Sequence, residues 1–495
     1  MEKNINGDHN PKPHAVLIPY PLQGHVIPAV HLAVKLASRG FTITFVNTLS
    51  VHHNIIKSQP KRPNNDHDDD IFAKLRKEES GLDIRYATIG DGFPLGFDRS
   101  LNLTQFWEGI RHVFSAHVDE LVGNMVNNSS DPVPLNCLIA DTFFVWPSTI
   151  AKKYNLVSIS FWTEPALVLT LYYHVKLLIK NGHHGSSHEN RKDTINYIPG
   201  VKAIEPKDLM SYLQATDTAT PEHQIIYKAF EEVKSADFII INTVEELEYE
   251  TISALKEKQP TYSIGPIFPT GFTKSLVATN LWSESDCTKW LDAKSHGTVL
   301  YVSFGSYAHA SKRDIEEIAY GLLLSGVSFI WVLRPDIVSS DEPDFLPVGY
   351  EDQIKDKGLI LTWCNQIGVI SHPAIGGFVT HCGWNSILES VWCGLPLLTY
   401  PLLTDQFTNR KLVVDDWKIG INLVDDHQNI TRDEIAEKIN RLMSGKSSDE
   451  LRKKVKEVRK TLENALDTAG SSVTNLNQFI NGVKFQIQNK NIRRL

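Results

Sequence analysis

Residues 363–406 have the sequence WCNQIGVISHPAIGGFVTHCGWNSILESVWCGLPLLTYPLLTDQ, which contains two short apolar runs, GFVT and LPLLTY. Continuous apolar runs of this length are typical of parallel strands that are buried on both faces. Residues 384–393 lie between the runs and are predicted to form a helix, which Gly394 and Pro396 would end. The stretch is therefore predicted to be a βαβ unit, whose turn at residues 381–383 lies where open sheets bind ligands.

The turn has the composition of a phosphate-binding site. Gly383 would let the backbone approach a ligand closely. Asn385 and Ser386 fall at or near the helix start, where unpaired N–H groups and the helix dipole attract anions. The dipole contributes about 0.3–1 kcal/mol, and up to about 2 kcal/mol when partly buried. His381 is a further donor that could carry positive charge beside a diphosphate.

The flanking residues suit the rest of a nucleotide sugar. Glu389 lies one turn along the same helix face, so its carboxylate could reach a sugar diol beyond the phosphates. Before the turn, Trp363 and Gln366 combine a flat aromatic face with an amide that can read a base edge, and after it Asp405 and Gln406 could bind hydroxyls. Each of these residues alone could be a core aromatic or a plain helix cap, but the order base, ribose, diphosphate and hexose predicts a nucleotide-sugar site.

This segment resembles the signature box of plant family 1 UDP-glycosyltransferases, over its full length and including the THCGWNS core and the terminal Asp-Gln. The resemblance implies an α/β fold of two tandem Rossmann-like, doubly wound domains that face a cleft, the GT-B type. It implies that UDP is bound by Trp363, Cys364, Gln366, His381, Asn385, Ser386, Glu389, Ser303 and Ser306. It implies that the sugar is bound by Thr163, Trp384, Asp405 and Gln406. Asn365 stands where the family usually has Pro, and the loss of a fixed φ is expected to loosen the turn that presents Trp363.

A base and a partner that orients it are predicted in the first half of the chain. Residues 14–19 (HAVLIP) read as a buried strand, and His25 follows in the loop at its carboxyl end, the usual functional edge of such a sheet. Residues 135–141 (LNCLIAD) read as another strand, which ends in Asp141 at the same edge. A carboxylate there can hold one ring nitrogen and leave the other ready to take a proton. The resemblance makes His25 the catalytic base; the alternatives are a loop histidine bonded to backbone and an aspartate that caps a helix.

Bulk properties exclude several classes of protein. A length of 495 residues permits two or three domains, and a net charge of −8 with a pI near 6.2 argues against a nucleic-acid partner. There is no apolar run long enough for a membrane span and no secretory signal pattern, so a cytoplasmic location is expected. No CxxC spacing supports a disulfide framework or a zinc site. No metal is expected, because His381, Ser306 and the helix start would take the charge of the leaving group, and no cofactor is expected, because the UDP-sugar is a co-substrate.

Two motifs resemble functional ones. Residues 68–70 (DDD) could suggest metal-binding aspartates, but their Pro/Asn/His/Asp-rich surroundings predict a solvated loop. Residues 90–96 (GDGFPLG) approximate a dinucleotide fingerprint, with one residue too many and with Pro94 where a helix should begin. A nucleotide-cofactor oxidoreductase is therefore the less favoured alternative. A non-catalytic nucleotide-sugar-binding protein would keep the box but lose His25 and Asp141, and both are present.

Composition divides the chain into domains. Residues 1–258 are predicted to bind the acceptor, and their sheet is expected to close with the strand at 237–242. Residues 259–280 are rich in Pro and Gly and are predicted to be a linker. Residues 281–469 are predicted to bind the UDP-sugar. By analogy with the family, a final helix at about 470–486 crosses back to brace the first domain.

The predicted reaction is the inverting transfer of glucose from UDP-glucose to a hydroxyl or carboxyl of a small apolar plant metabolite. By resemblance, Gln406 indicates glucose, because relatives that prefer galactose often have His there. An apolar acceptor pocket would suit a phenolic, flavonoid or terpenoid compound. Its candidate aromatic residues, each of which could equally be core, are Phe93, Phe143, Phe144, Trp146, Trp162 and Tyr172.

Overall fold

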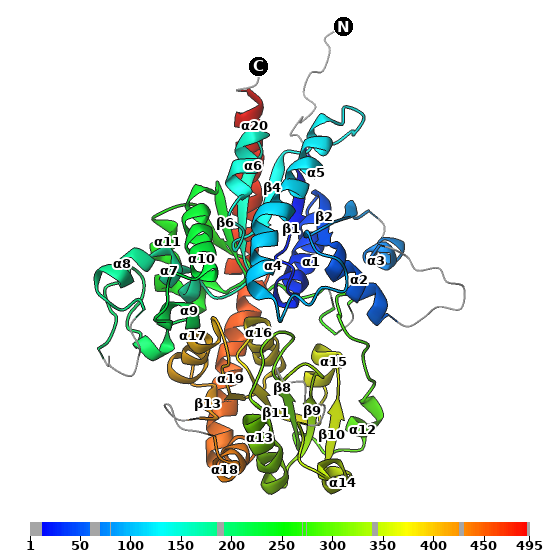
Figure 1. The fold of residues 1–495 in the computed structure, drawn as a ribbon, viewed down its shortest axis with the longest axis vertical. Helices are drawn as coiled ribbons and strands as arrows, with labels where there is room; N and C mark the ends of the chain where they lie inside the picture. The colour runs from blue at the N-terminus through cyan, green and yellow to red at the C-terminus, as the bar shows by residue number, and fades with distance from the viewer. Residues whose placement is uncertain are drawn as a thin grey trace.

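Two all-parallel β-sheets organise the chain, one in each half of the molecule (Figure 1). The structure is a computed structural model. It describes residues 12–59, 70–79, 81–185, 193–269, 271–273, 275–338, 345–424 and 430–492. The aspartates at positions 68 and 69 lie outside these residues, so a solvated loop at these positions stays a prediction.

The N-terminal sheet has seven strands in the order β3-β2-β1-β4-β5-β6-β7, and every pair is parallel. Alternate residues of β1 belong to different apolar clusters, Val16 and Ile18 on one face and Ala15 and Leu17 on the other. A strand that is apolar at every position is therefore buried on both sides, as its sequence predicts. The strands are β1 (His14–Ile18), β2 (Thr42–Thr48), β3 (Ile84–Ile89), β4 (Cys137–Asp141), β5 (Val157–Trp162), β6 (Phe238–Ile241) and β7 (Thr261–Ser263).

The C-terminal sheet repeats this plan with six parallel strands in the order β10-β9-β8-β11-β12-β13. Alternate residues of its central strand again face opposite sides, with Val299 and Tyr301 in one cluster and Leu300 and Val302 in another. The strands are β8 (Val299–Ser303), β9 (Ser328–Val332), β10 (Gly358–Leu361), β11 (Ile375–Thr380), β12 (Leu397–Thr399) and β13 (Gly420–Asn422).

Helices cover both sheets. In the N-terminal half they are α1 (Gln23–Ala37), α2 (Leu49–Ser58), α3 (Ala73–Glu78), α4 (Leu103–Gly109), α5 (Ser115–Asn127), α6 (Pro147–Lys153), α7 (Ala166–Tyr173), α8 (Val175–Lys180), α9 (Ser211–Gln214), α10 (Pro221–Glu232) and α11 (Tyr249–Lys256). In the rest of the chain they are α12 (Thr288–Asp292), α13 (Lys312–Ser325), α14 (Tyr350–Ile354), α15 (Gln366–Ile370), α16 (Trp384–Cys393), α17 (Gln406–Lys411), α18 (Arg432–Met443), α19 (Gly445–Leu466) and α20 (Ser471–Ile492). Short helical turns are η1 (Ile110–Phe114), η3 (Pro206–Asp208), η4 (Val233–Ser235), η5 (Glu245–Leu247) and η6 (Leu412–Asp416). No helix among these described residues is long and apolar enough to cross a membrane.

The last helix returns to the first half of the molecule, as Figure 1 shows for α20 in red. Its apolar residues Leu476, Phe479 and Val483 recur at helical spacing and join the cluster that covers one face of β1. The ring centroid of Phe479 lies 5.8 Å from that of Phe238 in β6, so α20 packs on the N-terminal sheet.

The predicted end of the first sheet is wrong by one strand. Strand β7 (Thr261–Ser263) pairs with β6 beyond the strand expected at 237–242, inside the predicted linker. Its sequence, Thr-Tyr-Ser, has no apolar run and follows Pro260, so its own pattern does not show it to be a strand. The connection between the sheets therefore begins after Ser263.

The strand orders place the functional edges of the two sheets. In each sheet the order reverses beside the first strand, between β1 and β4 and between β8 and β11. Ligands of doubly wound sheets bind outside the carboxyl ends of the strands at this point. His25 and Asp141 follow or end the two strands of the first reversal, and Ser306 and His381 follow the two strands of the second.

Candidate active site

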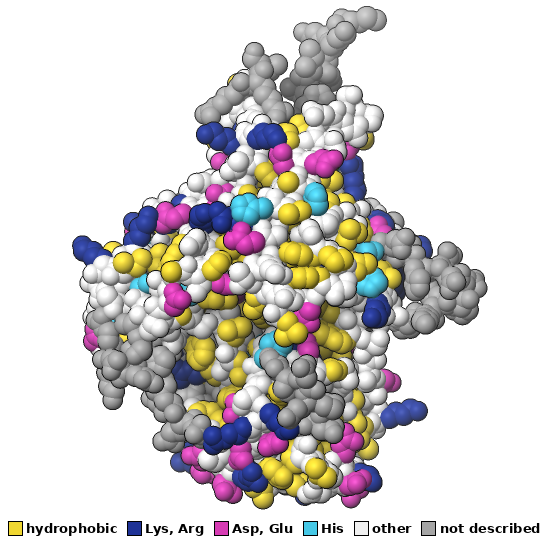
Figure 2. All heavy atoms as spheres, in the orientation of Figure 1, with side chains coloured by type: hydrophobic (Ala, Val, Ile, Leu, Met, Phe, Trp, Pro, Cys, Tyr) yellow, Lys and Arg dark blue, Asp and Glu magenta, His cyan; other side chains and the backbone are white. Residues whose placement is uncertain are grey.

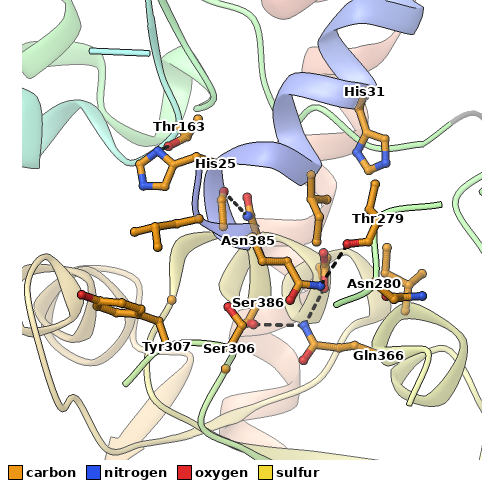
Figure 3. Close-up of a pocket in the computed structure, with 18 of the residues that line it drawn as sticks. His25, His31, Thr163, Thr279, Asn280, Ser306, Tyr307, Gln366, Asn385 and Ser386 are labelled. Atoms are coloured by element: carbon orange, nitrogen blue, oxygen red, sulfur yellow. Dashed lines mark hydrogen bonds between the residues drawn. The ribbon is translucent and has the colours of Figure 1, made fainter. Parts of the chain in front are cut away.

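A cavity of about 570 Å³ lies between the two halves of the molecule and takes its lining from both. The face shown in Figure 2 is hollowed between the two halves, with hydrophobic side chains in the walls. Figure 3 shows His25 and Thr163 of the N-terminal half on one side of the cavity, with Ser306, Gln366 and Ser386 of the C-terminal half on the other.

His25 is held from one ring nitrogen. It lies in the first turn of α1, is 9% exposed, and its Nδ1 is 2.7 Å from Oδ2 of Asp141 at the end of β4. The hydroxyl of Thr163, just beyond β5, is 3.1 Å from the same Nδ1. The other oxygen of Asp141, Oδ1, accepts the Phe143 N–H at 3.0 Å. Because a carboxylate only accepts, Nδ1 carries the proton and the Nε2 lone pair is left for chemistry in the cavity.

The wall of the cavity around His25 is aromatic. Its six aromatic residues are Tyr20, Trp107, Phe143, Tyr172, Tyr212 and Tyr307, the last contributed by the loop after β8. Only Phe143 and Tyr172 of these were predicted. The sequence offers no apolar periodicity that would assign the other four to a pocket, because they come from loops and short helices far apart in the chain.

Four residues predicted to line the acceptor pocket do not border the cavity. Phe144, Trp146 and Trp162 are core residues, 1%, 7% and 0% exposed. Phe93 stacks on Phe97, with ring centroids 4.3 Å apart. Phe143 lies in the turn after β4, where the Phe144 N–H donates to the Asp141 carbonyl at 3.2 Å, and it borders the cavity while its neighbour packs in the core.

The C-terminal side of the cavity contains the turn between β11 and α16. Cys382 has φ +68°, a left-handed conformation that costs a non-glycine residue roughly 1–3 kcal/mol. Its N–H bonds the Thr380 hydroxyl at 3.1 Å and its carbonyl accepts from Asn409 at 2.9 Å, which holds the turn in place. A Cβ on Gly383 would lie 2.5 Å from Nε2 of His381, so this close approach requires glycine. Helix α16 begins directly after it at Trp384.

The predicted positive charge on His381 is not supported. Burial, with the nearby Arg334 guanidinium, lowers the pKa of His381 to about 4, so the ring is neutral near pH 7. Its Nδ1 is buried and has no hydrogen-bond partner among the described residues. His381 can therefore serve a diphosphate as a hydrogen-bond donor rather than as a cation.

Sequence reasoning missed Arg334, which is 1% exposed and holds the loop after β8. Its guanidinium donates to the carbonyls of Gly305 and Ala308, the latter at 2.8 Å. Ser306 in this loop lines the cavity as predicted. Ser303 does not: it is the last residue of β8, 3% exposed, and its hydroxyl lies 3.4 Å from the Gly305 N–H. Ser303 therefore supports the loop instead of bordering the cavity.

The residues predicted to bind the uracil ring and the ribose lie together in the structure. Trp363, Cys364, Gln366 and Glu389 all line the cavity, and the Gln366 amide donates to Glu389 at 2.7 Å. It also donates to the hydroxyl of Ser386, which lines the cavity too, at 3.0 Å.

Two further contacts shape this part of the site. Trp282 was not predicted; its ring centroid is 4.8 Å from that of Trp363 and supports this indole. Burial raises the pKa of Glu389 to about 7, opposed by the hydrogen bond from Gln366.

The turn that presents Trp363 is not loosened by Asn365. The backbone φ of Asn365 is −69°, within the range that proline would impose. Its side chain caps α15 by accepting the Gly368 N–H at 2.9 Å, a bond that proline cannot make. Asn365 therefore replaces the missing ring constraint with a helix cap.

The predicted sugar-binding residues also line the cavity. The carbonyl oxygen of Gln406 accepts the N–H groups of Leu402 and Leu403 at 2.8 and 2.9 Å, so its NH₂ is the group left to donate. Asp405 accepts from the Thr404 hydroxyl at 2.7 Å and from Asn409 at 2.5 Å, and burial raises its pKa.

Two predicted site residues join the halves of the molecule across the cavity. The Trp384 indole N–H donates to the carbonyl of Asn242 at 2.7 Å, so it is not free for a sugar. The Asn385 amide donates to the carbonyl of Gly24 at 2.8 Å, one residue before His25 (Figure 3). The helix start at Trp384 is thereby fixed directly opposite the start of α1.

Comparison with known proteins identifies the family. Residues 272–460 match the family model described as UDP-glucoronosyl and UDP-glucosyl transferase. The chain is 62% identical over 483 residues to UDP-glycosyltransferase 86A1 of Arabidopsis thaliana, which covers 97% of this chain and 96% of the relative. The chain belongs to the plant family 1 UDP-glycosyltransferases. This UDP-glycosyltransferase is also 35% identical, over 95% of its length and 97% of the relative, to 7-deoxyloganetin glucosyltransferase of Gardenia jasminoides.

Solved structures agree with the architecture. UGT2 of Phytolacca americana, complexed with UDP-2fluoro-glucose and pterostilbene, is 26% identical with a TM-score of 0.74, over 95% of this chain and 98% of that one. Os79 of O. sativa in complex with UDP has a TM-score of 0.78 over 96% and 99% of the two chains; at 24% identity it shows the fold alone. The UDP-glycosyltransferase thus has the GT-B fold, two Rossmann-like domains with a cavity between them.

Proposed function

We propose that this UDP-glycosyltransferase transfers glucose from UDP-glucose to a hydroxyl of a small aromatic acceptor, with inversion at the anomeric carbon. The acceptor is bound mainly by the N-terminal domain and the UDP-sugar by the C-terminal domain. One observation carries the proposal: His25, held by Asp141 at 2.7 Å, lines the same cavity as the start of α16. The proposed base and the proposed anion site therefore line one cavity.

The step is a direct displacement. The acceptor oxygen forms a bond to the anomeric carbon while the bond from that carbon to the diphosphate oxygen breaks. The acceptor's proton passes to Nε2 of His25, and UDP leaves with the electron pair on the side opposite the attack, so an α-linked donor gives a β-glycoside. General-base catalysis contributes roughly 10²–10⁴-fold, whereas alignment of the two substrates can supply about 7–11 kcal/mol. Positioning therefore dominates.

The leaving diphosphate is bound by neutral donors and the helix start. The start of α16, which has no side-chain cap among the described residues, borders the cavity together with Ser306 and a neutral His381. Fixed donors of this kind stabilise charge as it develops. We infer that transfer needs neither a metal nor a cofactor besides the UDP-sugar. Activity that disappears in EDTA and returns with Mg²⁺ would contradict this inference.

Glucose as the donor is supported by the sugar end of the cavity. Gln406 offers an oriented NH₂ donor, and Asp405 beside it is a buried acceptor. The relative from Gardenia jasminoides is named as a glucosyltransferase. Calorimetric titration with UDP-glucose, UDP-galactose and UDP-xylose tests the proposal, and tighter productive binding of either of the last two would refute it.

The aromatic wall supports a flat phenolic, flavonoid or related acceptor. Rings on this wall, among them Trp107 and Phe143, could stack on such a compound. A structure similar to this one binds the stilbene pterostilbene. A screen of hydroxylated plant metabolites with UDP-glucose, followed by mass shift, would identify the acceptor.

The base assignment is tested by His25→Ala. We expect it to lower kcat at least about 10²-fold while UDP-glucose binds within about threefold of wild type, because the UDP site lies on the other domain. His112→Ala, which changes an exposed histidine on the surface of the same domain, is the matched control and should leave kcat unchanged. Equal turnover by wild type and His25→Ala would show that another group is the base.

A further inference from the structure

Glu164 is a carboxyl group in the cavity that the proposed mechanism does not use. It follows Thr163, whose hydroxyl contacts the ring of His25, at the carboxyl edge of the N-terminal sheet. Its Oε2 is inaccessible to solvent and has no hydrogen-bond partner among the described residues. A buried polar atom without a partner costs roughly 1–3 kcal/mol, so this arrangement is expected to serve a ligand that supplies the partner.

The surroundings of Glu164 favour its neutral form. Burial raises the pKa of Glu164 well above its ordinary value, and the carboxyls of Asp405 and Asp141 raise it further. These two carboxyls come from opposite domains, at the start of α17 and at the end of β4. The phenol of Tyr172 on α7 is the other titratable group beside Glu164, and its pKa is also raised by burial and by that carboxyl. Burial and the two neighbouring carboxyls therefore favour the protonated form of the side chain, which can donate a hydrogen bond.

A second unpartnered group lies nearby in the same wall. Tyr20 is 2% exposed and lines the cavity, and its hydroxyl has no hydrogen-bond partner among the described residues. Its ring centroid is 5.8 Å from that of His25. Thr163 and Glu164 follow β5 and Tyr20 follows β1, so these groups reach the cavity from the carboxyl ends of two strands. In their protonated forms both unpartnered groups can donate as well as accept.

We propose that Glu164 is a specificity-determining residue that donates a hydrogen bond to an uncharged hydroxyl of a bound substrate beside His25. Substrates that place a carboxylate at this point are rejected, because it would meet Asp141 and Asp405 in a poorly solvated space. The hydroxyl belongs either to the transferred sugar, which Asp405 also faces, or to a second position on the acceptor. This inference rests on the proposed transferase function and adds a rule for substrate choice to it.

The test compares Glu164→Ala with the nearly isosteric Glu164→Gln, which keeps a donor at every pH. For the sugar, UDP-glucose and its deoxy analogues, each lacking one hydroxyl, are titrated by calorimetry. For the acceptor, resveratrol and pterostilbene are titrated onto the enzyme–UDP complex, because pterostilbene has methoxyl groups where resveratrol has hydroxyls. In one of these two pairs, Glu164→Ala should weaken binding of the compound that carries the hydroxyl by about tenfold and leave binding of the analogue that lacks it unchanged. The pair that responds shows whether the sugar or the acceptor supplies the hydroxyl. Glu164→Gln should stay within about threefold of wild type.

Two further readouts separate this role from a structural one. Wild type should lose affinity for the selected substrate at alkaline pH, as Glu164 ionises among Asp141, Asp405, Tyr172 and His25, whereas Glu164→Gln should not. UDP-glucuronate should bind at least about tenfold more weakly than UDP-glucose if the sugar is the source. If Glu164→Ala weakens every substrate equally, or none, the proposal is wrong. Loss of turnover in His25→Ala tests the proposed function separately, because calorimetry of the Glu164 variants needs no turnover.

Discussion

Asp141→Asn should reverse the tautomer of the His25 ring, and the contacts of Asp141 explain why. The oxygen of Asp141 that accepts the Phe143 N–H at 3.0 Å must remain an oxygen in the variant, because an NH₂ there would face another donor. The new NH₂ is therefore forced toward Nδ1 of His25, at the position that is now 2.7 Å away. Nδ1 must then accept, its proton moves to Nε2, and the nitrogen that faces the acceptor can no longer take a proton.

The size of the effect follows from what is lost. The whole general-base contribution disappears, about 10²–10⁴-fold in kcat, or roughly 2.7–5.4 kcal/mol. The corresponding aspartate-to-asparagine change in a serine protease triad lies at the upper end, at about 10⁴. Asp141→Ala should be less damaging, about 10–10²-fold, because the Thr163 hydroxyl at 3.1 Å can still accept from Nδ1 and keep the tautomer.

The assay is initial rates with saturating UDP-glucose and acceptor, and ¹⁵N NMR of the His25 ring reports the tautomer. UDP affinity serves as the control and should be within about threefold of wild type. Thr163→Val, which leaves Asp141 in place, should lose less than about tenfold. The reasoning fails if Asp141→Asn keeps more than about a tenth of wild-type kcat, or if it is faster than Asp141→Ala with both variants folded.

Three further predictions concern stability and ligand binding. The pKa of Glu389 is about 7 in the folded protein and about 4.5 in the unfolded chain, so between these pH values the folded protein holds a proton that the unfolded chain has lost. The free energy of unfolding therefore falls by roughly 3 kcal/mol as the pH rises from about 4.5 to about 7. Glu389→Gln should therefore raise the melting temperature relative to wild type more at pH 8 than at pH 5, and an equal shift at both would contradict this. Arg410 on α17 forms a buried ion pair with Asp208 of the other domain. Arg410→Ala should lower the free energy of unfolding by about 3–5 kcal/mol, because it leaves the buried Asp208 carboxylate without its partner, and adding Asp208→Ala should restore most of the stability in thermal denaturation. Purely additive losses in the double variant would show that the two residues do not stabilise each other. Asn365→Ala removes the cap of α15, which is worth about 0.5–2 kcal/mol, and should weaken UDP binding, measured by calorimetry, by up to this amount. Asn365→Pro should bind UDP nearly as wild type does. Weaker binding by Asn365→Pro than by Asn365→Ala would refute the role of the cap.

The fold could be predicted from local signals that are strong in this chain. Helix α16 occupies residues 384–393 as predicted, because Gly383 and Gly394 mark its ends and Gly394 adopts a left-handed conformation, with φ +76°. The contact between His25 and Asp141, 116 positions apart, followed from the rule that carboxyl ends of parallel strands share one edge.

The acceptor wall could not be predicted in the same way. Its aromatic residues come from loops and short helices, and whether a ring faces core or cavity depends on the neighbouring elements rather than on its own sequence. Trp162 ends β5 and turns into the core, where its indole N–H bonds the Pro165 carbonyl at 2.9 Å, whereas Thr163 turns to the cavity. The neutrality of His381 was missed for a related reason, since a sequence does not show how deeply a turn is buried.

The central claim is that an acceptor hydroxyl, deprotonated by His25, attacks the anomeric carbon opposite a diphosphate held at the start of α16. The anomeric configuration of the product tests it most directly, measured by proton NMR of the glycoside formed from UDP-α-glucose. Wild type should give a β-glycoside, and His25→Ala should form it at least about 10²-fold more slowly. An α-glycoside would contradict it, because a single displacement from the side opposite UDP cannot retain the configuration.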